Sequence, residues 1–444
     1  MTRAGTRSGK PSGFTNWARN QHCDPKQFLS PGTTEEISNI VSAAHHNGGR
    51  VKPVGSGHSF TDTACTPGTL IRLDRLQEFH GVDPGTGIAS VDAGITLRAL
   101  SEQLDRAGRA LPNLGDIDVQ TLAGAIATAT HGTGALLQNL SAGIAGFEIV
   151  TGTGEVLWCD LTKNSELWRH GRVGLGALGI ITRIAIHTVP AFTLEARETV
   201  EPLSGLVDGF SDFVSDVRHA EFFWFPGSDR ALVKRNQTTS SEPRPPSKLV
   251  HRFNKYVLEN RAFEAALQAA KRFPGQRTRI RDFMEAVAGS SRTIDKSYRV
   301  FASPRLVRFV EMEYGIPVDA VPEAITRLRA LIDTIDDPPL FPVEVRVSAA
   351  DDIPLSTGYG RDSGWIAVHQ YRGMDYESYF HEVAEIMDGL NGRPHWGKLH
   401  YLDAETLRSR YPEWDSFQQV RTSIDPTGTF RNAYLDRVLG WPDR

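Results

Sequence analysis

Apolar and polar positions alternate between helical and strand spacing through the first 110 residues. Thr33 and Glu36 have the spacing of a capping box, and apolar residues behind them recur on one helical face. The expected elements are a helix from Thr33 to the glycines at 48–49, strands at 50–54, 70–73 and 89–91, and an amphipathic helix over 96–107. This order is typical of a layered unit of helices and strands.

Small residues dominate the next segment, 111–134, which includes Gly115, Gly124, Gly132 and Gly134. Beyond it the pattern predicts strands at 147–151 and 155–159, a short helix at 165–170, and a glycine-rich approach to a strand that closes at Pro190. Glycine is therefore concentrated before residue 190, where the backbone can approach a ligand closely.

The character of the chain changes after residue 190, where glycine-rich loops become fewer. Expected helices lie near 255–272, 322–333 and 376–389, expected strands near 220–224, 308–314, 342–348 and 365–371, and a polar, proline-rich loop at 238–247. This pattern predicts a second, α+β domain over 191–393. Residues 394–444 read as loops with short helices, and the polar residues 1–13 as a disordered leader.

Composition narrows the class of protein. The 444 residues carry 49 basic and 53 acidic side chains, a net charge of −4, which argues against a dedicated nucleic-acid binder. Three cysteines without a CxxC pair indicate neither a disulfide framework nor a zinc ribbon, and the spacing of His395 and His400 predicts no metal site. No apolar stretch is long enough for a membrane span, so we expect a cytoplasmic protein, with peripheral membrane association left open.

The first glycine loop, GSGHSF at 55–60, follows an expected strand. It departs from the dinucleotide fingerprint GxGxxG because Phe60 stands at the third glycine and no helical pattern follows. A nicotinamide site is therefore disfavoured. Small-residue segments nevertheless recur at 55–59, 121–124, 128–134 and 176–181. One long ligand lying over all four, such as FAD, accounts for this recurrence, because the backbone N–H groups of such loops bind anions.

Six motifs in order carry a family resemblance: VKPVGSGHSF, LAGAIATATHGTG, LGALGIIT, EVRV, HWGK and DPTGTF. Over about residues 14–440 the chain resembles the flavin oxidoreductases of the vanillyl-alcohol-oxidase type. Within them it is most similar to the sugar-1,4-lactone oxidases and dehydrogenases and to the alditol oxidases. The resemblance implies an α+β fold with a two-subdomain FAD-binding domain at 14–190, a cap or substrate domain at 191–393, and a C-terminal segment, 394–444, that returns to the FAD domain.

The resemblance also implies how FAD is held. Covalent members of the family attach the flavin 8α-methyl to the histidine of GxGHS, which is His58 here. A neutral imidazole nitrogen is a suitable nucleophile for that carbon; the alternative is a histidine that only hydrogen-bonds in the loop. The implied cofactor-binding residues are Val54, Gly55, Ser56, Gly57, His58, Ser59, Asp116, Thr121, Gly124, Thr128, Thr130, His131, Ile180 and Ile181.

Glu344 and Arg346 stand two apart on an expected strand, so both side chains share one face, and valines occupy the other. On pattern alone the pair could be a surface ion pair. The resemblance makes this face the substrate wall, with Arg346 supplying fixed positive charge and Glu344 orienting Arg346 or a substrate hydroxyl.

Two further residues complete the predicted catalytic set. The similar alditol oxidases place a histidine and a lysine beside the reacting carbinol at the positions of His369 and Lys398. Histidine suits removal of a hydroxyl proton near neutral pH, and lysine suits stabilisation of an alkoxide. Tyr371 shares the face of His369 and is an expected substrate contact. Asp116, expected at both flavin and substrate, stands where relatives often carry serine.

Together these features predict an FAD-dependent oxidation of an alcohol group on an aldono-1,4-lactone or a sugar alcohol. The expected electron acceptor is oxygen or a cytochrome or quinone, and Gly115 favours oxygen because relatives gate oxygen access near that place. The alternatives are a flavin oxidase for another hydroxylated metabolite, a non-catalytic flavoprotein, and a nicotinamide dehydrogenase.

Overall fold

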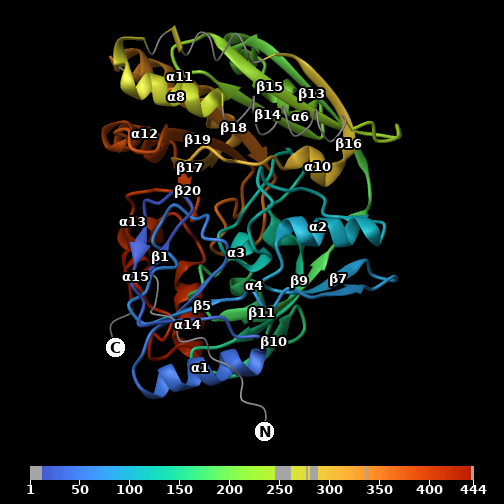
Figure 1. Cartoon of the computed structure of the whole chain (residues 1–444), viewed down its shortest axis with the longest axis vertical. Coiled ribbons are helices and arrows are strands. Elements are labelled where there is room, and N and C mark those ends of the chain that lie inside the picture. The colour runs from blue at the N-terminus through green and yellow to red at the C-terminus, as the bar shows by residue number, and fades with distance from the viewer. Residues whose placement is uncertain (1–12, 246–261, 277–278, 281–288, 337, 442–444) are drawn as a thin grey trace.

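The computed structural model describes residues 13–245, 262–276, 279–280, 289–336 and 338–441. Helices and strands are mixed throughout, and two parts lie one above the other in Figure 1. The lower part holds the N-terminal elements and the red C-terminal helices, and the upper part holds a large sheet. The expected leader up to residue 12, positions 246–247 of the proline-rich loop and positions 255–261 of an expected helix lie outside the described residues.

Two sheets organise the lower part. The larger has five antiparallel strands in the order β10-β9-β11-β7-β6, and the smaller is parallel, in the order β3-β5-β4. Their bounds are β3 (Gln27–Leu29), β4 (Val51–Val54), β5 (Thr69–Arg72), β6 (Phe79–Val82), β7 (Ile88–Asp92), β9 (Ile144–Val150), β10 (Val156–Asp160) and β11 (Ile180–His187). Two short pairs join β1 (Phe14–Thr15) to β2 (His22–Cys23) and β8 (Arg109–Ala110) to β12 (Val189–Pro190).

Capped helices pack against these sheets. Thr33 accepts a hydrogen bond from the backbone of Glu36 at 3.1 Å, which confirms the predicted cap of α1 (Thr34–His46), and Thr96 caps α2 (Leu97–Arg106) in the same way. The other N-terminal helices are α3 (Leu122–Ala127), η1 (Leu140–Gly143) and α4 (Ser165–Gly171). The C-terminal helices α13 (Ala404–Arg408), α14 (Trp414–Ile424) and α15 (Ala433–Leu439) share one apolar core with the two lower sheets.

One eight-stranded sheet forms the upper part, in the order β16-β13-β15-β14-β18-β19-β17-β20. Its strands are β13 (Thr193–Pro202), β14 (His219–Trp224), β15 (Arg230–Thr239), β16 (Ser291–Lys296), β17 (Phe309–Pro317), β18 (Val343–Ser348), β19 (Ser363–Tyr371) and β20 (Arg393–Pro394). The helices are α5 (Leu203–Asp208), α6 (Phe210–Ser215), α8 (Phe263–Arg272), η3 (Pro274–Gln276), α10 (Ser297–Phe301), η4 (Val318–Ala320), α11 (Val321–Thr334) and α12 (Glu377–Gly389).

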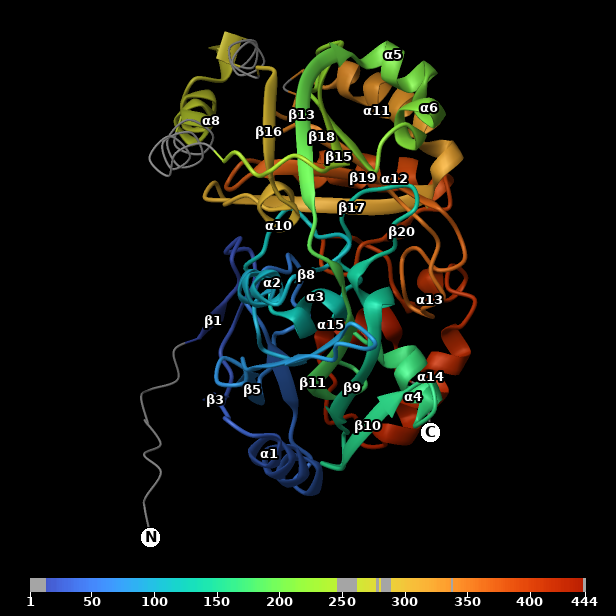
Figure 2. The same cartoon turned by 90° about the vertical axis from the view of Figure 1, so that its right-hand side faces the viewer.

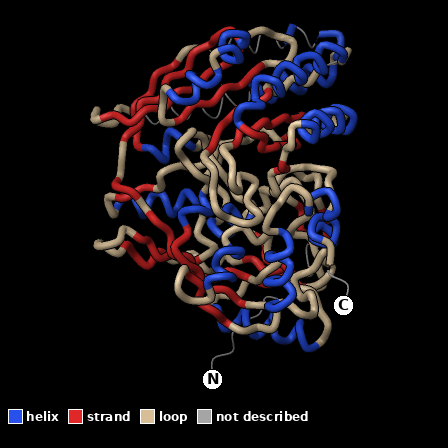
Figure 3. Tube along the Cα trace, turned by 180° about the vertical axis from the view of Figure 1, so that it is seen from behind, coloured by secondary structure: helices blue, strands red, loops and turns tan. Residues whose placement is uncertain are grey.

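The two faces of this sheet differ in polarity. Val343, Val345 and Val347 of β18 are buried in an apolar core with residues of α5, α6, α11 and α12. Because side chains alternate along a strand, Glu344 and Arg346 point to the opposite face. That face looks toward the lower part, and the tan loops in Figure 3 fill the region between the two parts. The fold therefore presents a polar strand face to the loops of the lower part.

The predicted elements before residue 190 and the four predicted strands after it are all present, with ends shifted by a few residues. The predicted helix at 255–272 is described from α8 onward. The strands β13, β15 and β16 were not anticipated, since their exposed faces carry mixed polar residues rather than a clean alternation. None of the helices in the described ranges is long and apolar enough to cross a membrane.

Candidate active site

A cleft that is partly open to solvent lies among the glycine-rich loops of the lower part. Eleven of the predicted cofactor residues line it: Val54, Gly55, Ser56, Gly57, His58, Ser59, Thr121, Gly124, Thr128, Ile180 and Ile181. The four small-residue segments therefore meet around one cleft, as a long ligand requires.

The residues that line this cleft fit a bound FAD. A Cβ atom at Gly55 would collide with the hydroxyl of Thr121, and Gly57 has φ of 70°, so both positions favour glycine. Lys52 is the buried cation on the lining, and its Nζ donates to the carbonyl of Gly176 at 3.1 Å. Burial lowers the pKa of Lys52 to about 7, and a bound pyrophosphate would favour its charged form.

His58 lines the cleft and stands beside a cluster of aromatic rings. The indole of Trp17 stacks on its imidazole, and the neighbouring backbone N–H of Phe60 donates to the carbonyl of Gly397 at 2.8 Å. Burial lowers the pKa of His58 to about 4, and the charges of Lys398 and Arg308 add to this effect. The imidazole is therefore neutral at neutral pH, as a nucleophile must be.

Three predicted cofactor residues do not line the cleft. Asp116 instead pairs with arginines below the strand face, and His131 pairs with Glu313 of β17 at 3.2 Å. Thr130 accepts a hydrogen bond from Gln120, a residue that does line the cleft, at 3.3 Å. These three side chains lie between the cleft and the polar face of the upper sheet.

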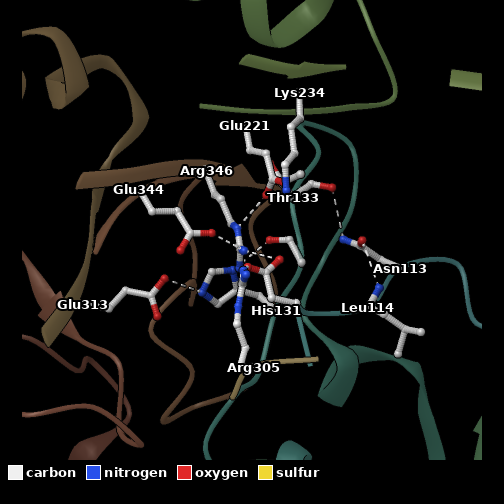
Figure 4. A network of polar contacts seen from close by, with 12 residues as sticks. Asn113, Leu114, His131, Thr133, Glu221, Lys234, Arg305, Glu313, Glu344 and Arg346 are labelled. Atoms are coloured by element: carbon white, nitrogen blue, oxygen red, sulfur yellow. Dashed lines mark hydrogen bonds and ion pairs between the residues drawn. The ribbon is translucent and has the colours of Figure 1, made fainter. Parts of the chain in front are cut away.

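Arg346 is the centre of the polar network drawn in Figure 4. Its Nε donates to Glu221 at 2.9 Å, and its Nη2 contacts both Asp116 and Glu344. Arg305 holds the other oxygen of Asp116 at 2.7 Å. The side chains of Arg346 and Glu344 are only 9% and 8% exposed. The alternative of a surface ion pair is therefore wrong for these two residues.

Charge in this network is unequally shared between its carboxyl groups. Burial would raise the pKa of Asp116, but Arg346, Arg305 and Lys234 hold it well below its usual range. Burial raises the pKa of Glu344 well above its usual range, because the neighbouring carboxylates of Asp116, Glu221 and Glu311 reinforce it and outweigh Arg346. The network therefore favours the anionic form of Asp116 and disfavours that of Glu344.

His369 and Lys398 meet at a residue that the sequence patterns did not single out, Glu311 of β17. Nε2 of His369 lies 3.6 Å from one oxygen of Glu311, and Nζ of Lys398 lies 2.5 Å from the other. Nδ1 of His369 is 3.1 Å from the carbonyl of Pro342. Since a carbonyl only accepts, Nδ1 carries a proton, and Nε2 is the nitrogen that faces Glu311 and, at 3.9 Å, Glu344.

Glu313 and His131 form a second buried pair next to Lys398. The His131 ring stacks on Trp365 with centroids 3.6 Å apart, and its ligand atoms lie within 4.8 Å of those of Glu313 and His395. The prediction that no metal is bound depends only on the spacing of His395 and His400. It does not take this three-residue cluster into account. His400 lies elsewhere, 3.4 Å from the hydroxyl of Tyr434.

Tyr371 is buried in an apolar cluster with Phe341, Leu340 and residues of α8. Phe341 also contacts the His369 ring, with centroids 6.0 Å apart. Tyr371 is thus placed on the strand face of His369, as expected, but among apolar neighbours rather than in the charged cluster.

Four residues of the site were missed by reasoning from the sequence: Glu221, Arg305, Glu311 and Glu313. Glu311 and Glu313 are two apart on a predicted strand, and the apolar residues Val310 and Met312 alternate with them. This is the pattern that identified Glu344 and Arg346, so it could have found them. Glu221 and Arg305 carry no comparable local signal.

A glycine-lined cleft, with a buried and charged strand face in the same molecule, is the arrangement expected of a flavin-dependent oxidoreductase with an α+β fold. The chain belongs to the D-arabinono-1,4-lactone oxidase family, whose pattern matches residues 184–438, and the FAD binding domain pattern matches residues 25–160. These matches confirm the predicted family and the predicted FAD-linked class.

Individual relatives agree with this membership. The chain is 44% identical over 427 residues to L-gulono-1,4-lactone dehydrogenase of Mycobacterium tuberculosis, covering 96% of this chain and 99% of that protein. It is 32% identical to L-gulonolactone oxidase of Bos taurus and 28% identical to alditol oxidase of a Streptomyces species, each over 96% of this chain and 98% of the relative. A crystal structure of cholesterol oxidase from B. sterolicum has a TM-score of 0.81 at 17% identity, covering 99% and 100% of the two chains, which confirms the predicted fold class.

Proposed function

We propose that this enzyme oxidises an alcohol group of an aldono-1,4-lactone, such as L-gulono-1,4-lactone, or of a sugar alcohol. The observation that carries the proposal is the cluster of Glu344, Arg346, His369 and Lys398, in which Nζ of Lys398 lies over the ring of Phe60, directly after the loop 55–59 that lines the cleft. A purely binding protein has no need of a buried base beside a buried cation. FAD, when bound, supplies the acceptor for the hydride that leaves the substrate carbon.

The chain's own residues would supply the rest of the chemistry. Nε2 of His369 takes the hydroxyl proton as the hydride leaves carbon, while the charges of Lys398 and Arg346 stabilise developing negative charge on oxygen. The network of Arg346 with Asp116 and Glu221 fixes its planar guanidinium, so this charge is already oriented before the reaction. Polar groups of the same face would bind the remaining hydroxyl groups of the substrate.

We further propose that His58 carries the flavin covalently. Support comes from its place on the cleft lining and its neutral state at pH 7. The domain limits proposed for this arrangement are 14–190 for FAD binding, 191–393 for the cap and 394–444 for the returning segment. A cytoplasmic location is proposed on composition, and the three cysteines are unpaired.

A substrate screen tests the proposed activity. Aldono-1,4-lactones and alditols are mixed with the FAD-loaded protein in the absence of oxygen. A substrate is identified by loss of the flavin absorbance near 450 nm, with a rate constant in the ~1–10³ s⁻¹ range that is typical of enzyme turnover. Repeating the positive reactions with oxygen, a cytochrome or a quinone analogue identifies the acceptor. Failure of every lactone and alditol to bleach the flavin would contradict the proposed function.

A further inference from the structure

Glu311 bridges the two proposed catalytic groups from a strand at the edge of the active site. Figure 2 shows β17 running along the side of the upper sheet that faces the lower part. Glu311 lies directly opposite His369 in the pairing of β17 with β19. Its carboxylate oxygens reach Nε2 of His369 at 3.6 Å and Nζ of Lys398 at 2.5 Å. Its carbonyl also accepts from the backbone of Leu399 at 2.9 Å, so the turn that carries Lys398 is fixed by the same residue.

The titratable groups that face Lys398 come from several elements. They are Glu311 and Glu313 on β17, Glu344 on β18, and His58 and His395 in the adjoining loops. Burial would lower the pKa of Lys398, but Glu311 and Glu313 outweigh burial and raise it. Burial would likewise raise the pKa of Glu311, but Lys398 and His369 lower it to about 2. Each partner therefore holds the other in its charged form.

Glu344 is placed differently, because its Oε1 contacts Arg346 and its Oε2 lies 3.9 Å from Nε2 of His369. Glu311 is the carboxylate that contacts both His369 and Lys398. A buried lysine without such a counter-ion tends to lose its proton near neutral pH. A neutral Lys398 could not stabilise an alkoxide.

We propose that Glu311 is the positioning residue of this active site, which keeps Lys398 cationic and serves as the counter-ion of His369 after proton transfer. The proposal rests on the proposed function, in which His369 is the base. In that step the substrate O–H bond breaks and an N–H bond forms at Nε2, while the hydride leaves carbon with its electron pair for the flavin. The new Nε2–H then faces Glu311, in the way a buried carboxylate supports a catalytic imidazolium.

The test compares Glu311→Gln with a matched control, Glu313→Gln. Both residues are buried on the same face of β17, but Glu313 pairs with His131 instead of contacting Lys398. The rate of flavin reduction by saturating L-gulono-1,4-lactone is measured without oxygen from pH 6 to 10. We expect Glu311→Gln to be at least ~10-fold slower at pH 9 than at pH 7, with little change in KM, because Lys398 loses its proton. Wild-type protein should show no such loss, and Glu313→Gln a smaller one.

A second readout needs no substrate. Acylation of Lys398 by N-hydroxysuccinimidyl acetate, followed by mass spectrometry, reports its neutral fraction, and Lys234 is the internal reference. The two side chains are 20% and 25% exposed, and Lys234 is paired with Glu221 instead. We expect acylation of Lys398 at pH 8 to be at least ~5-fold faster in Glu311→Gln than in wild type, with Lys234 unchanged.

These readouts separate the two proposals. If no lactone or alditol reduces the flavin of the wild-type protein, the proposed function is overturned. The acylation rates would still decide the role of Glu311. Unchanged acylation in Glu311→Gln, or an equal alkaline loss in Glu313→Gln, would overturn the role of Glu311. If Glu311→Gln does not fold, Glu311→Asp is used instead, because it retains the charge. We expect flavin reduction in Glu311→Asp to be slower, but with no fall in rate between pH 7 and 9. A fall in rate over that range would refute the proposal.

Discussion

The indole ring of Trp17 stacks on the imidazole of His58, with ring centroids 5.2 Å apart and planes inclined by 21°. Trp17 is itself held by Phe309 and by Arg308, whose guanidinium donates to its carbonyl. The stacking fixes one face of the imidazole, and the cleft lies beside the ring. This arrangement presents a neutral histidine in one orientation, and it leads to the first two predictions.

His58→Ala should release the flavin on acid denaturation. Acid unfolds the loops, so a flavin that is only bound dissociates into the supernatant, whereas a histidyl bond survives and leaves a yellow pellet. We expect at least ~90% of wild-type flavin in the pellet and almost none for the variant, measured by absorbance after precipitation. A colourless pellet from fully loaded wild-type protein would remove the covalent bond from the proposal and leave the fold intact.

Flavin incorporation should be insensitive to pH in the range where an ordinary histidine titrates. Burial, Lys398 and Arg308 lower the pKa of His58 to about 4, so the imidazole stays neutral from about pH 5 upward and becomes protonated only below. When FAD-free protein is incubated with FAD, the covalent bond should therefore form at the same rate at every pH between 5.5 and 8. An inflection near pH 6.5 would contradict this. Arg308→Met is the control, and it should move the acid loss to higher pH.

How far the sequence predicted the site depends on whether a residue has a local signal. Glu344 and Arg346 were identifiable because valines alternate with them, and the glycine loops because four of them recur. Asp116, expected at both flavin and substrate, lies under Arg346 and Arg305, since its position is set by contacts between distant segments, 189 residues apart for Arg305. Glu221 is also remote from Arg346, at a separation of 125 residues. Pairings of this kind depend on strand order, which periodicity alone does not give.

Arg346→Lys should impair turnover although it retains the charge. Arg346 contacts Glu221 through Nε, and Asp116 and Glu344 through Nη2, a set that one ammonium group cannot reproduce. We expect a loss of at least ~100-fold in kcat/KM, from steady-state kinetics with the substrate of the screen. Arg305→Lys is the control, because Arg305 pairs with Asp116 alone at 2.7 Å, and its loss should be much smaller. Near-wild-type kcat/KM in Arg346→Lys would place the guanidinium outside the catalytic network.

Glu344→Gln should be tolerated at neutral pH. Burial and the neighbouring carboxylates raise the pKa of Glu344, which favours its protonated form, and glutamine matches that form in shape and charge. We expect flavin reduction at pH 7 to fall by less than ~5-fold. Asp116→Asn removes an anion that Arg346 and Arg305 keep ionised, and its loss should be larger. Equal losses in the two variants would mean that Glu344 works as an anion.

His369→Ala and Lys398→Met should differ in their pH dependence, which is the sharpest test of the roles assigned to them. A general base typically contributes ~10²–10⁴-fold, and loss of His369 should cost that rate together with the fall of kcat/KM at low pH. Nδ1 of His369 lies 3.1 Å from the carbonyl of Pro342, so Nε2 is the nitrogen left to take the substrate proton. Lys398 stays protonated because Glu311 and Glu313 raise its pKa against the effect of burial, so Lys398→Met removes a fixed charge and should slow flavin reduction at every pH. Stopped-flow reduction without oxygen measures both effects apart from the acceptor, with Lys234→Met as the control for a lost buried cation. If the acid limb persisted in His369→Ala, another group would take the proton, and the roles of His369 and Lys398 would have to be exchanged.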